Sequence, residues 1–179
     1  MTMKRSIIPA LLATIVAASC AHAASDYLLE IDGIKGESSD SRHPGTIEIE
    51  SFSWGANTAS DSGGGGGGAG KVSLQDIHFT ARLTKAGPQL FLATTGTNFI
   101  SYATLFLRRT GGVNGEEEEY YQIKMQDVLV SSYSQSANSS ASGGPIPTDQ
   151  FTLNFEKIST TYIGPDGATS SGTIARVRQ

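Results

Sequence analysis

Apolar and polar residues alternate over most of this chain, and turns rich in Gly, Pro and Asn interrupt the alternation. Successive side chains of a β-strand point to opposite sides, so each alternating segment predicts a strand with one buried face. Only Pro88–Gly96 has the proline start and glycine end that are typical of a helix. The predicted strands, at least seven in number, cover residues 26–32, 46–54, 72–83, 99–109, 120–132, 149–162 and 172–179.

In several predicted strands the apolar residues change side partway along. The changes fall near Glu50–Ser51, Gln75–Asp76 and Gln126–Asp127. A β-bulge produces such a change and adds twist and bend, as in a sheet that curls into a barrel. We therefore expect an all-β fold, a β-barrel of two packed antiparallel sheets with one short flanking α-helix. The helix is expected to face Leu90, Phe91 and Thr94 inward.

The connections between these strands are polar or rich in glycine. Gly33–Gly45 and Gly55–Gly70 are expected to be loops, and Ser134–Pro147 a flexible loop rich in Ser, Gly, Ala and Asn. Glu116–Glu119 places four carboxylates in a row. Calcium loops interleave carboxylates with Gly and carbonyl ligands, so a solvated turn is the better interpretation.

A glycine run nearly forms a phosphate-binding P-loop, because Gly65 is followed five residues later by Gly70-Lys71. That motif requires Ser or Thr after the Lys as a Mg²⁺ ligand, and it must open a helix. Val72 stands in the ligand position, and a strand is predicted to follow. Nucleotide binding is therefore disfavoured, and no cofactor is predicted.

The first 23 residues have the pattern of a secretory signal peptide. Lys4-Arg5 is a basic start, an apolar segment follows, and Ala21-His22-Ala23 predicts cleavage between Ala23 and Ala24. The apolar segment is too short to span a bilayer, which takes about 20 residues. An alternative is lipidation of Cys20, because Ala17-Ala18-Ser19-Cys20 resembles a bacterial lipoprotein box. The expected organisation is a signal peptide over 1–23 and one barrel domain over 24–179, secreted or periplasmic after cleavage.

Charge and cysteine content limit the partners of the mature chain. The net charge of −4 becomes −6 when Lys4 and Arg5 are removed. An acidic chain has no general attraction to nucleic acid or anionic lipid, so neither nucleic-acid binding nor stable membrane insertion is expected. The single Cys lies in the leader, which excludes disulfides, thiol nucleophiles and Cys-based metal sites from the mature chain.

No residue pattern typical of an enzyme was found, and no catalytic or metal-binding residue is predicted. His43 and His78 belong to no metal-binding or catalytic motif, and His78 is expected at the surface. Glu30 and Asp32 share one strand face and could form a glycosidase-like pair, although solvation at a sheet edge explains them as well. Trp54 is expected to pack in the core rather than at an interface.

Several motifs in register resemble the haemolysin-coregulated protein (Hcp) family. They include Ile34-Lys35-Gly36-Glu37-Ser38, Ser53-Trp54-Gly55, the glycine run with Gly70-Lys71-Val72, Gln75-Asp76-Ile77-His78-Phe79-Thr80 and Pro88-Gln89-Leu90. Further matches are Leu107-Arg108-Arg109 before a Gly-Gly turn, Val128-Leu129-Val130-Ser131-Ser132 and Thr152-Leu153-Asn154-Phe155. Together they span nearly all of residues 26–163.

The resemblance implies a structural, non-enzymatic tube protein of bacterial type VI secretion. It implies homohexameric rings that stack into a tube, a lumen able to carry effectors, and sheath and spike proteins as partners. It also implies that the glycine-rich loop contributes to ring stacking. The residues of this loop are Gly63, Gly64, Gly65, Gly66, Gly67, Gly68, Ala69, Gly70 and Lys71.

The leader departs from the family pattern, because family members assemble from cytoplasmic subunits and ordinarily have no signal peptide. Two alternatives to the tube subunit therefore stay open. One is an exported periplasmic or lipid-anchored binding module outside the injection machine. The other is an exported hydrolase that uses Glu30 and Asp32.

Overall fold

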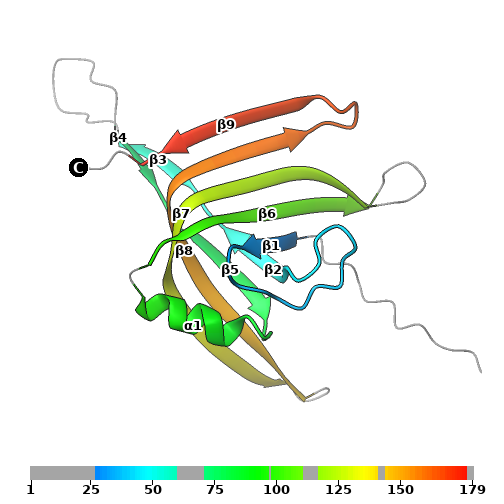
Figure 1. The fold of residues 1–179 in the computed structure, drawn as a ribbon, viewed down its shortest axis with the longest axis vertical. Helices are drawn as coiled ribbons and strands as arrows, with labels where there is room; N and C mark the ends of the chain where they lie inside the picture. The colour runs from blue at the N-terminus through cyan, green and yellow to red at the C-terminus, as the bar shows by residue number, and fades with distance from the viewer. Residues whose placement is uncertain (1–26, 60–70, 97, 111–116, 141–143, 177–179) are drawn as a thin grey trace, which may run out of the picture.

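The described residues form an antiparallel β-barrel with one short helix, which confirms the predicted fold class (Figure 1). The computed structural model describes residues 27–59, 71–96, 98–110, 117–140 and 144–176. The elements are β1 (Tyr27–Ile31), β2 (Ile47–Ser53), β3 (Ala56–Ala59), β4 (Lys71–Leu74), β5 (Ile77–Arg82), α1 (Gly87–Thr95), β6 (Ile100–Thr110), β7 (Glu117–Ser140), β8 (Gly144–Ile163) and β9 (Thr169–Ala175).

Seven strands form one sheet in the order β5-β2-β1-β6-β7-β8-β9, and β5 also pairs with β8. This additional pairing closes six strands into the barrel. Strand β8 achieves it by pairing with β5 through residues 148–153 and with β9 through residues 157–163. Strand β9 is therefore an edge strand among the described elements, and β3 and β4 form a separate two-stranded sheet.

The alternating apolar residues fill the barrel. Ile31, Leu105, Ile123, Leu153 and Phe155 are fully buried in one cluster that includes residues from both halves of the sheet. Burial of each such side chain contributes about 1.5–3 kcal/mol relative to exposure. The alternation that predicted the strands is thus the pattern of inward-facing residues.

The predicted phase changes have different structural causes. In β2 the pairing with β5 shifts register between Ile49 and Ser51, which confirms the predicted bulge. In β7 the buried face passes from Met125 to Val128 across Asp127, which adopts a left-handed φ of 51°. Gln75–Asp76 is a break between β4 and β5 rather than a bulge, because β4 belongs to the separate sheet.

Helix α1 forms where predicted but presents a different face to the barrel. Leu90 is buried as expected, whereas Phe91 and Leu92 are 55% and 65% exposed. The prediction that Phe91 faces inward is wrong. The nine-residue helix packs against β7, and its buried residues are Gly87 and Leu90, with Ala93 partly buried against the core.

Ala56–Ala59, expected to lie in the loop Gly55–Gly70, form strand β3. Two further predicted connections are strands. Residues 134–140 and 144–147, expected to be a flexible loop, extend the β7–β8 ladder from Ser134↔Gln150 to Ser140↔Gly144. Glu117–Glu119, expected to lie in a solvated turn, begin β7 opposite Arg108–Thr110. In both cases cross-strand pairing outweighs low local strand propensity. No helix in the described ranges is long and apolar enough to cross a membrane.

Candidate functional site

A two-stranded ribbon, separate from the barrel sheet, flanks the glycine run in the sequence. Strands β3 and β4 pair from Ala56↔Leu74 to Ala59↔Lys71, and we call these two strands the arm. Gly63–Gly70 lie outside the described residues, and Lys71 is the first residue of β4. Because a strand begins at Lys71, the helix that a P-loop requires is absent there, in agreement with the sequence prediction. Figure 1 shows the ribbon beside the end of β9.

Asp76 connects the base of the arm to the barrel. It follows Gln75, whose backbone N–H donates to the Gly55 carbonyl over 2.9 Å and ends the ribbon. The Asp76 carboxylate then accepts hydrogen bonds from Asn154 Nδ2 (2.8 Å) on β8 and from Ser131 Oγ (3.1 Å) on β7. The β7–β8 register shift between Val130 and Ser132 falls at Ser131. Strands far apart in sequence therefore converge on one carboxylate.

Arg176, which directly follows β9, contacts the same carboxylate. Its Nη2 lies 2.7 Å from Asp76 Oδ1 and 3.1 Å from the carbonyl oxygen of Leu74, the last residue of β4. Its guanidinium carbon lies 5.2 Å from the centre of the Phe155 ring. Arginine combines charged hydrogen bonds with stacking on an aromatic face, so one side chain joins β9, the arm and the barrel wall.

A polar row continues from this base along the outer side of the barrel. His78 is exposed, as predicted, and its Nδ1 lies 2.8 Å from the Thr152 hydroxyl, which also accepts from Ser132 Oγ over 2.8 Å. Trp54 is half-buried against the core cluster, which is consistent with the predicted core role. The row therefore presents hydrogen-bond donors and acceptors along this side of the barrel.

The predicted carboxylate pair, Glu30 and Asp32, is divided between a strand and a turn. Glu30 Oε1 accepts a hydrogen bond from the Tyr102 hydroxyl over 3.2 Å, whereas Asp32 is exposed just after β1. That hydrogen bond to Glu30, together with its charge, raises the pKa of Tyr102. Among the described residues, no group of three His, Cys, Asp or Glu side chains is placed to hold a metal ion.

A buried charge cluster lies on another outer face, under the loop of residues 36–45, which we call the outer loop. Arg108 on β6 has a side chain only 4% exposed, and its Nη1 lies 2.6 Å from both Asp40 Oδ2 and Glu117 Oε2. Such a buried arginine needs these carboxylates, because an uncompensated buried charge costs several kcal/mol. The cluster therefore ties the outer loop to β6 and β7.

His43 forms the second contact of the outer loop. Its ring stacks on Phe106 at 4.0 Å between centres, and its Nε2 lies 2.7 Å from Glu119 Oε1. Gln122 Nε2 donates to the other Glu119 oxygen over 2.9 Å. Phe106 pairs in register with Leu28, which is also buried, so the outer loop covers a small apolar patch on the outside of the barrel.

Asp40 on the outer loop and Glu119 beneath it are held in their charged form. Burial opposes the charge of Asp40, but backbone hydrogen bonds from His43 and Arg42 and the Arg108 guanidinium outweigh it, so the pKa of Asp40 is lowered. Burial likewise opposes the charge of Glu119, and the hydrogen bonds from His43 and Gln122 lower its pKa overall. Asp40 and Glu119 are therefore ionised at neutral pH.

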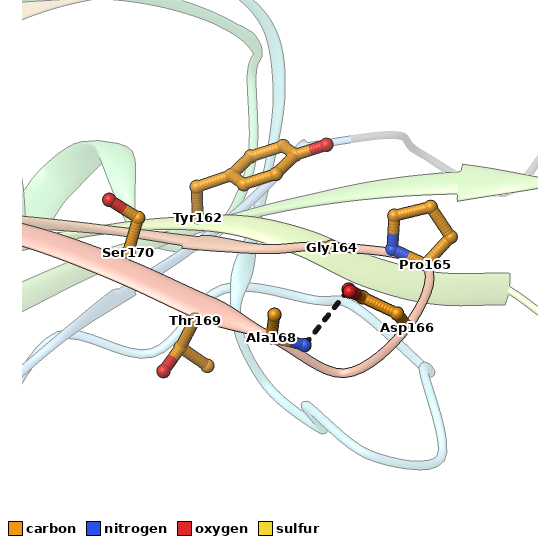
Figure 2. Close-up of a pocket in the computed structure, with 7 residues that line it drawn as sticks. All are labelled: Tyr162, Gly164, Pro165, Asp166, Ala168, Thr169 and Ser170. Atoms are coloured by element: carbon orange, nitrogen blue, oxygen red, sulfur yellow. Dashed lines mark hydrogen bonds between the residues drawn. The ribbon is translucent and has the colours of Figure 1, made fainter.

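A shallow hollow lies at the turn between β8 and β9 (Figure 2), and it is lined by Tyr162, Gly164, Pro165, Asp166, Ala168, Thr169 and Ser170. Figure 2 shows the Tyr162 ring and Pro165 on one side and Asp166 in the turn itself. Asp166 Oδ1 accepts the Ala168 N–H over 3.0 Å, and Gly167 has a φ of 77°. The carboxylate therefore closes the turn, and the hollow offers no second charged group for catalysis.

The sequence predicted a loop over Gly55–Gly70, so it missed strand β3 at Ala56–Ala59 and also missed the base of the arm. Asp76, Asn154 and Arg176 are separated by up to 100 residues, so no local spacing brings them together. A usable signal existed at Asp76, a carboxylate at the point where the apolar phase of the predicted strand changes. Arg108 likewise directly follows the apolar residues Leu105, Phe106 and Leu107 in a predicted strand.

The chain matches known proteins over most of its length. Residues 28–162 match the family described as "Type VI secretion system effector, Hcp". The protein hcp1 of Pseudomonas aeruginosa is 38% identical over 155 residues, covering 84% of this chain and 92% of that protein. The Hcp1 structure from Salmonella typhimurium is 28% identical, with a TM-score of 0.70, over 84% of this chain and 93% of that one.

A third comparison supports the fold alone. A structure titled as a type VI secretion system effector from Yersinia pestis is 23% identical, with a TM-score of 0.68, over 84% of this chain and 99% of that one. The overall fold is thus shared with these solved structures. This chain belongs to the Hcp family, the structural tube proteins of the type VI secretion system.

Proposed function

We propose that this protein is a non-enzymatic subunit that assembles into homohexameric rings, and that the rings stack into a type VI secretion tube. The match over residues 28–162 carries the proposal, because it includes the barrel and both strands of the arm. In this proposal the lumen carries effectors, and sheath and spike proteins are further partners. No cofactor, nucleic acid or stable membrane insertion is involved.

Two structural features support self-association. Strand β9 has seven exposed residues and pairs with β8 on one side only among the described strands. An exposed edge strand without charged residues is a template for pairing with another chain. The arm projects from the barrel and offers a second contact surface, and residues Gly63–Lys71 are proposed to take part in ring stacking.

Native mass spectrometry of the mature chain tests ring formation. The expected species at micromolar concentration is a hexamer, and negative-stain images should show rings and stacked tubes. A strictly monomeric protein under these conditions would contradict the proposal.

A second candidate function follows from the leader. We propose that residues 1–23 are a signal peptide cut between Ala23 and Ala24, which makes the protein secreted or periplasmic. An exported subunit cannot supply a cytoplasmic sheath, so a periplasmic or lipid-anchored Hcp-like binding module is the alternative to the tube subunit.

Mass spectrometry of the mature N-terminus separates these outcomes. Ala24 as the first residue indicates a released protein, whereas a lipidated Cys20 indicates an anchored one. An intact Met1 in protein recovered from the secreted fraction would contradict cleavage of the leader.

A further inference from the structure

The arm meets the barrel through few elements that could hold its direction. Within the described strands, β3 and β4 pair only with each other, over four residues each. A two-stranded ribbon of this length is marginally stable by itself, and nothing in its own ladder sets the angle at which it leaves the barrel. Contacts at its base must therefore provide that direction.

Side-chain contacts at the base come from β7, β8 and the residue after β9. The Asp76 carboxylate accepts hydrogen bonds from Ser131, Asn154 and Arg176. Arg176 also donates to the Leu74 carbonyl at the end of β4. Arg176 is itself held by its backbone N–H, which donates to the Glu156 carbonyl over 2.7 Å. The end of the β8–β9 ladder is thus hydrogen-bonded, through Arg176, to both the Asp76 carboxylate and the Leu74 carbonyl at the base of the arm.

The partial burial of this contact makes it stronger than an exposed ion pair. The side chains of Arg176 and Asp76 are 29% and 27% exposed, whereas the Arg82–Glu50 pair on the barrel wall is 75% and 42% exposed. Exposed pairs contribute little, because solvent screens them and long side chains lose entropy on pairing. The Arg176 guanidinium makes a charged hydrogen bond and also lies over the Phe155 ring, so the contact has a defined geometry.

We propose that Asp76 and Arg176 are positioning residues that set the direction of the arm for contact with a second copy of this chain in the neighbouring ring. The inference rests on the proposed stacking function and extends it to residues outside the glycine run. The end of β9 then has a part in assembly, because Arg176 links the β8–β9 ladder to the end of β4 and so fixes where β4 lies.

A distance measurement between two spin labels tests the positioning directly. The mature chain has no Cys, so Asn57→Cys on the arm and Lys85→Cys before α1 can be labelled selectively, and both side chains are exposed. Labelled chain is diluted with unlabelled chain so that one pair per assembly is observed. In Asp76→Asn and in Arg176→Gln we expect the distance distribution to widen at least twofold.

The control is Arg82→Gln, which removes an ion pair from the barrel wall and should leave the distribution unchanged. The double variant should be no wider than either single variant, because the two residues act through one contact. Circular dichroism confirms that the barrel stays folded. An unchanged distribution in both single variants would overturn the proposal.

Tube length on negative-stain grids provides the second measurement. We expect Arg176→Gln to form hexamers but to shorten stacked tubes at least threefold relative to the parent and to Arg82→Gln. A widened distribution with unchanged stacking would also overturn the proposal, since the direction of the arm would then have no role in ring contact. A parent chain that forms no hexamer would instead contradict the proposed function, and native mass spectrometry reports that separately.

Discussion

Single residues decide how the outer loop closes on the barrel. Gly36 N donates to the Gly45 carbonyl over 2.8 Å, and Ser38 N donates to the Thr46 carbonyl over 3.1 Å, which brings the two ends of the loop together. A Cβ atom at Gly36 would overlap the Thr46 carbonyl. The glycine is therefore required by close approach of two backbone segments.

Replacement of this glycine tests that requirement. Gly36→Ala should lower the free energy of unfolding by about 1–3 kcal/mol, because the backbone must move to admit the methyl group. Urea unfolding followed by circular dichroism measures the loss. Gly172→Ala on β9 is the matched control, since the nearest atom to its Cβ is 3.9 Å away, and it should change stability by less than about 0.5 kcal/mol. Equal losses in the two variants would contradict the close approach.

The contacts of the outer loop are expected to weaken in acid, so the folded protein should lose stability at low pH. The pKa values of Asp40 and Glu119 in the folded protein lie below their ordinary values of 3.8 and 4.5. Their contribution to stability is complete above the ordinary values and is lost as the pH falls through the lowered ones. Urea midpoints should therefore decrease between about pH 5 and about pH 3, and less steeply in Glu119→Gln than in the parent.

An exposed carboxylate provides the comparison for this experiment. Glu37 lies on the outer loop with its side chain in solvent, so Glu37→Gln should follow the parent curve. If Glu37→Gln and Glu119→Gln reduce the acid sensitivity equally, the contacts of Glu119 with His43 and Gln122 are not its source.

At the scale of elements, helix α1 docks through a polar contact that amphipathicity does not show. Asp149 is 1% exposed and accepts a hydrogen bond from the Tyr133 hydroxyl over 2.9 Å. A Cβ on Gly87 would lie 2.8 Å from that hydroxyl and 3.0 Å from Asp149 Oδ2, so the helix begins directly on this pair. Burial, followed by the hydrogen bond to Asp149, raises the pKa of Tyr133 to about 12.

Removing the Tyr133 hydroxyl should loosen the helix. Tyr133→Phe leaves a buried carboxylate without this donor, and the expected loss is about 1–3 kcal/mol of unfolding free energy. Hydrogen exchange over α1 should accelerate in the same variant. Tyr162→Phe removes a hydroxyl from an exposed ring and should leave both measurements unchanged. Unaltered exchange in Tyr133→Phe would show that the pair does not hold the helix.

At the scale of the whole molecule, the glycine run is expected to act between subunits. Shortening Gly63–Gly68 to two glycines should leave the barrel folded and the hexamer intact, because the barrel closes without the arm. Tube stacking should weaken, as read from tube length on negative-stain grids. Stacking that survives unaltered would reduce the run to a linker between β3 and β4.

A matched deletion at the opposite hairpin controls for chain length. Asn138↔Ile146 and Ser139↔Pro145 are two facing pairs near the end of the β7–β8 ladder. Deleting these four residues shortens that hairpin without changing the register of the rest. Tubes as short as those of the glycine variant would show that stacking responds to any shortening.

Local chemistry determined most of the barrel. Strand alternation and the bulge at Glu50–Ser51 are properties of neighbouring residues, because side-chain direction repeats every two residues and a bulge shifts it by one. The helix start at Pro88 has the same local origin, since proline is pre-organised for the first turn. The glycine run and the strand after it were likewise evident without a structure.

Long-range pairing decided the rest. Residues 134–140 and 144–147 lack strand propensity but form strands because they complete the β7–β8 ladder. Phe91 is exposed because the buried stripe of α1 is narrow. The outer loop cluster around Arg108 and the convergence on Asp76 join segments up to 100 residues apart. The sequence by itself determined a barrel with a glycine-rich connection between two of its predicted strands. Only the tertiary structure decided how the arm is held, because ion pairs and hydrogen bonds between distant strands depend on which strands the closed sheet brings together.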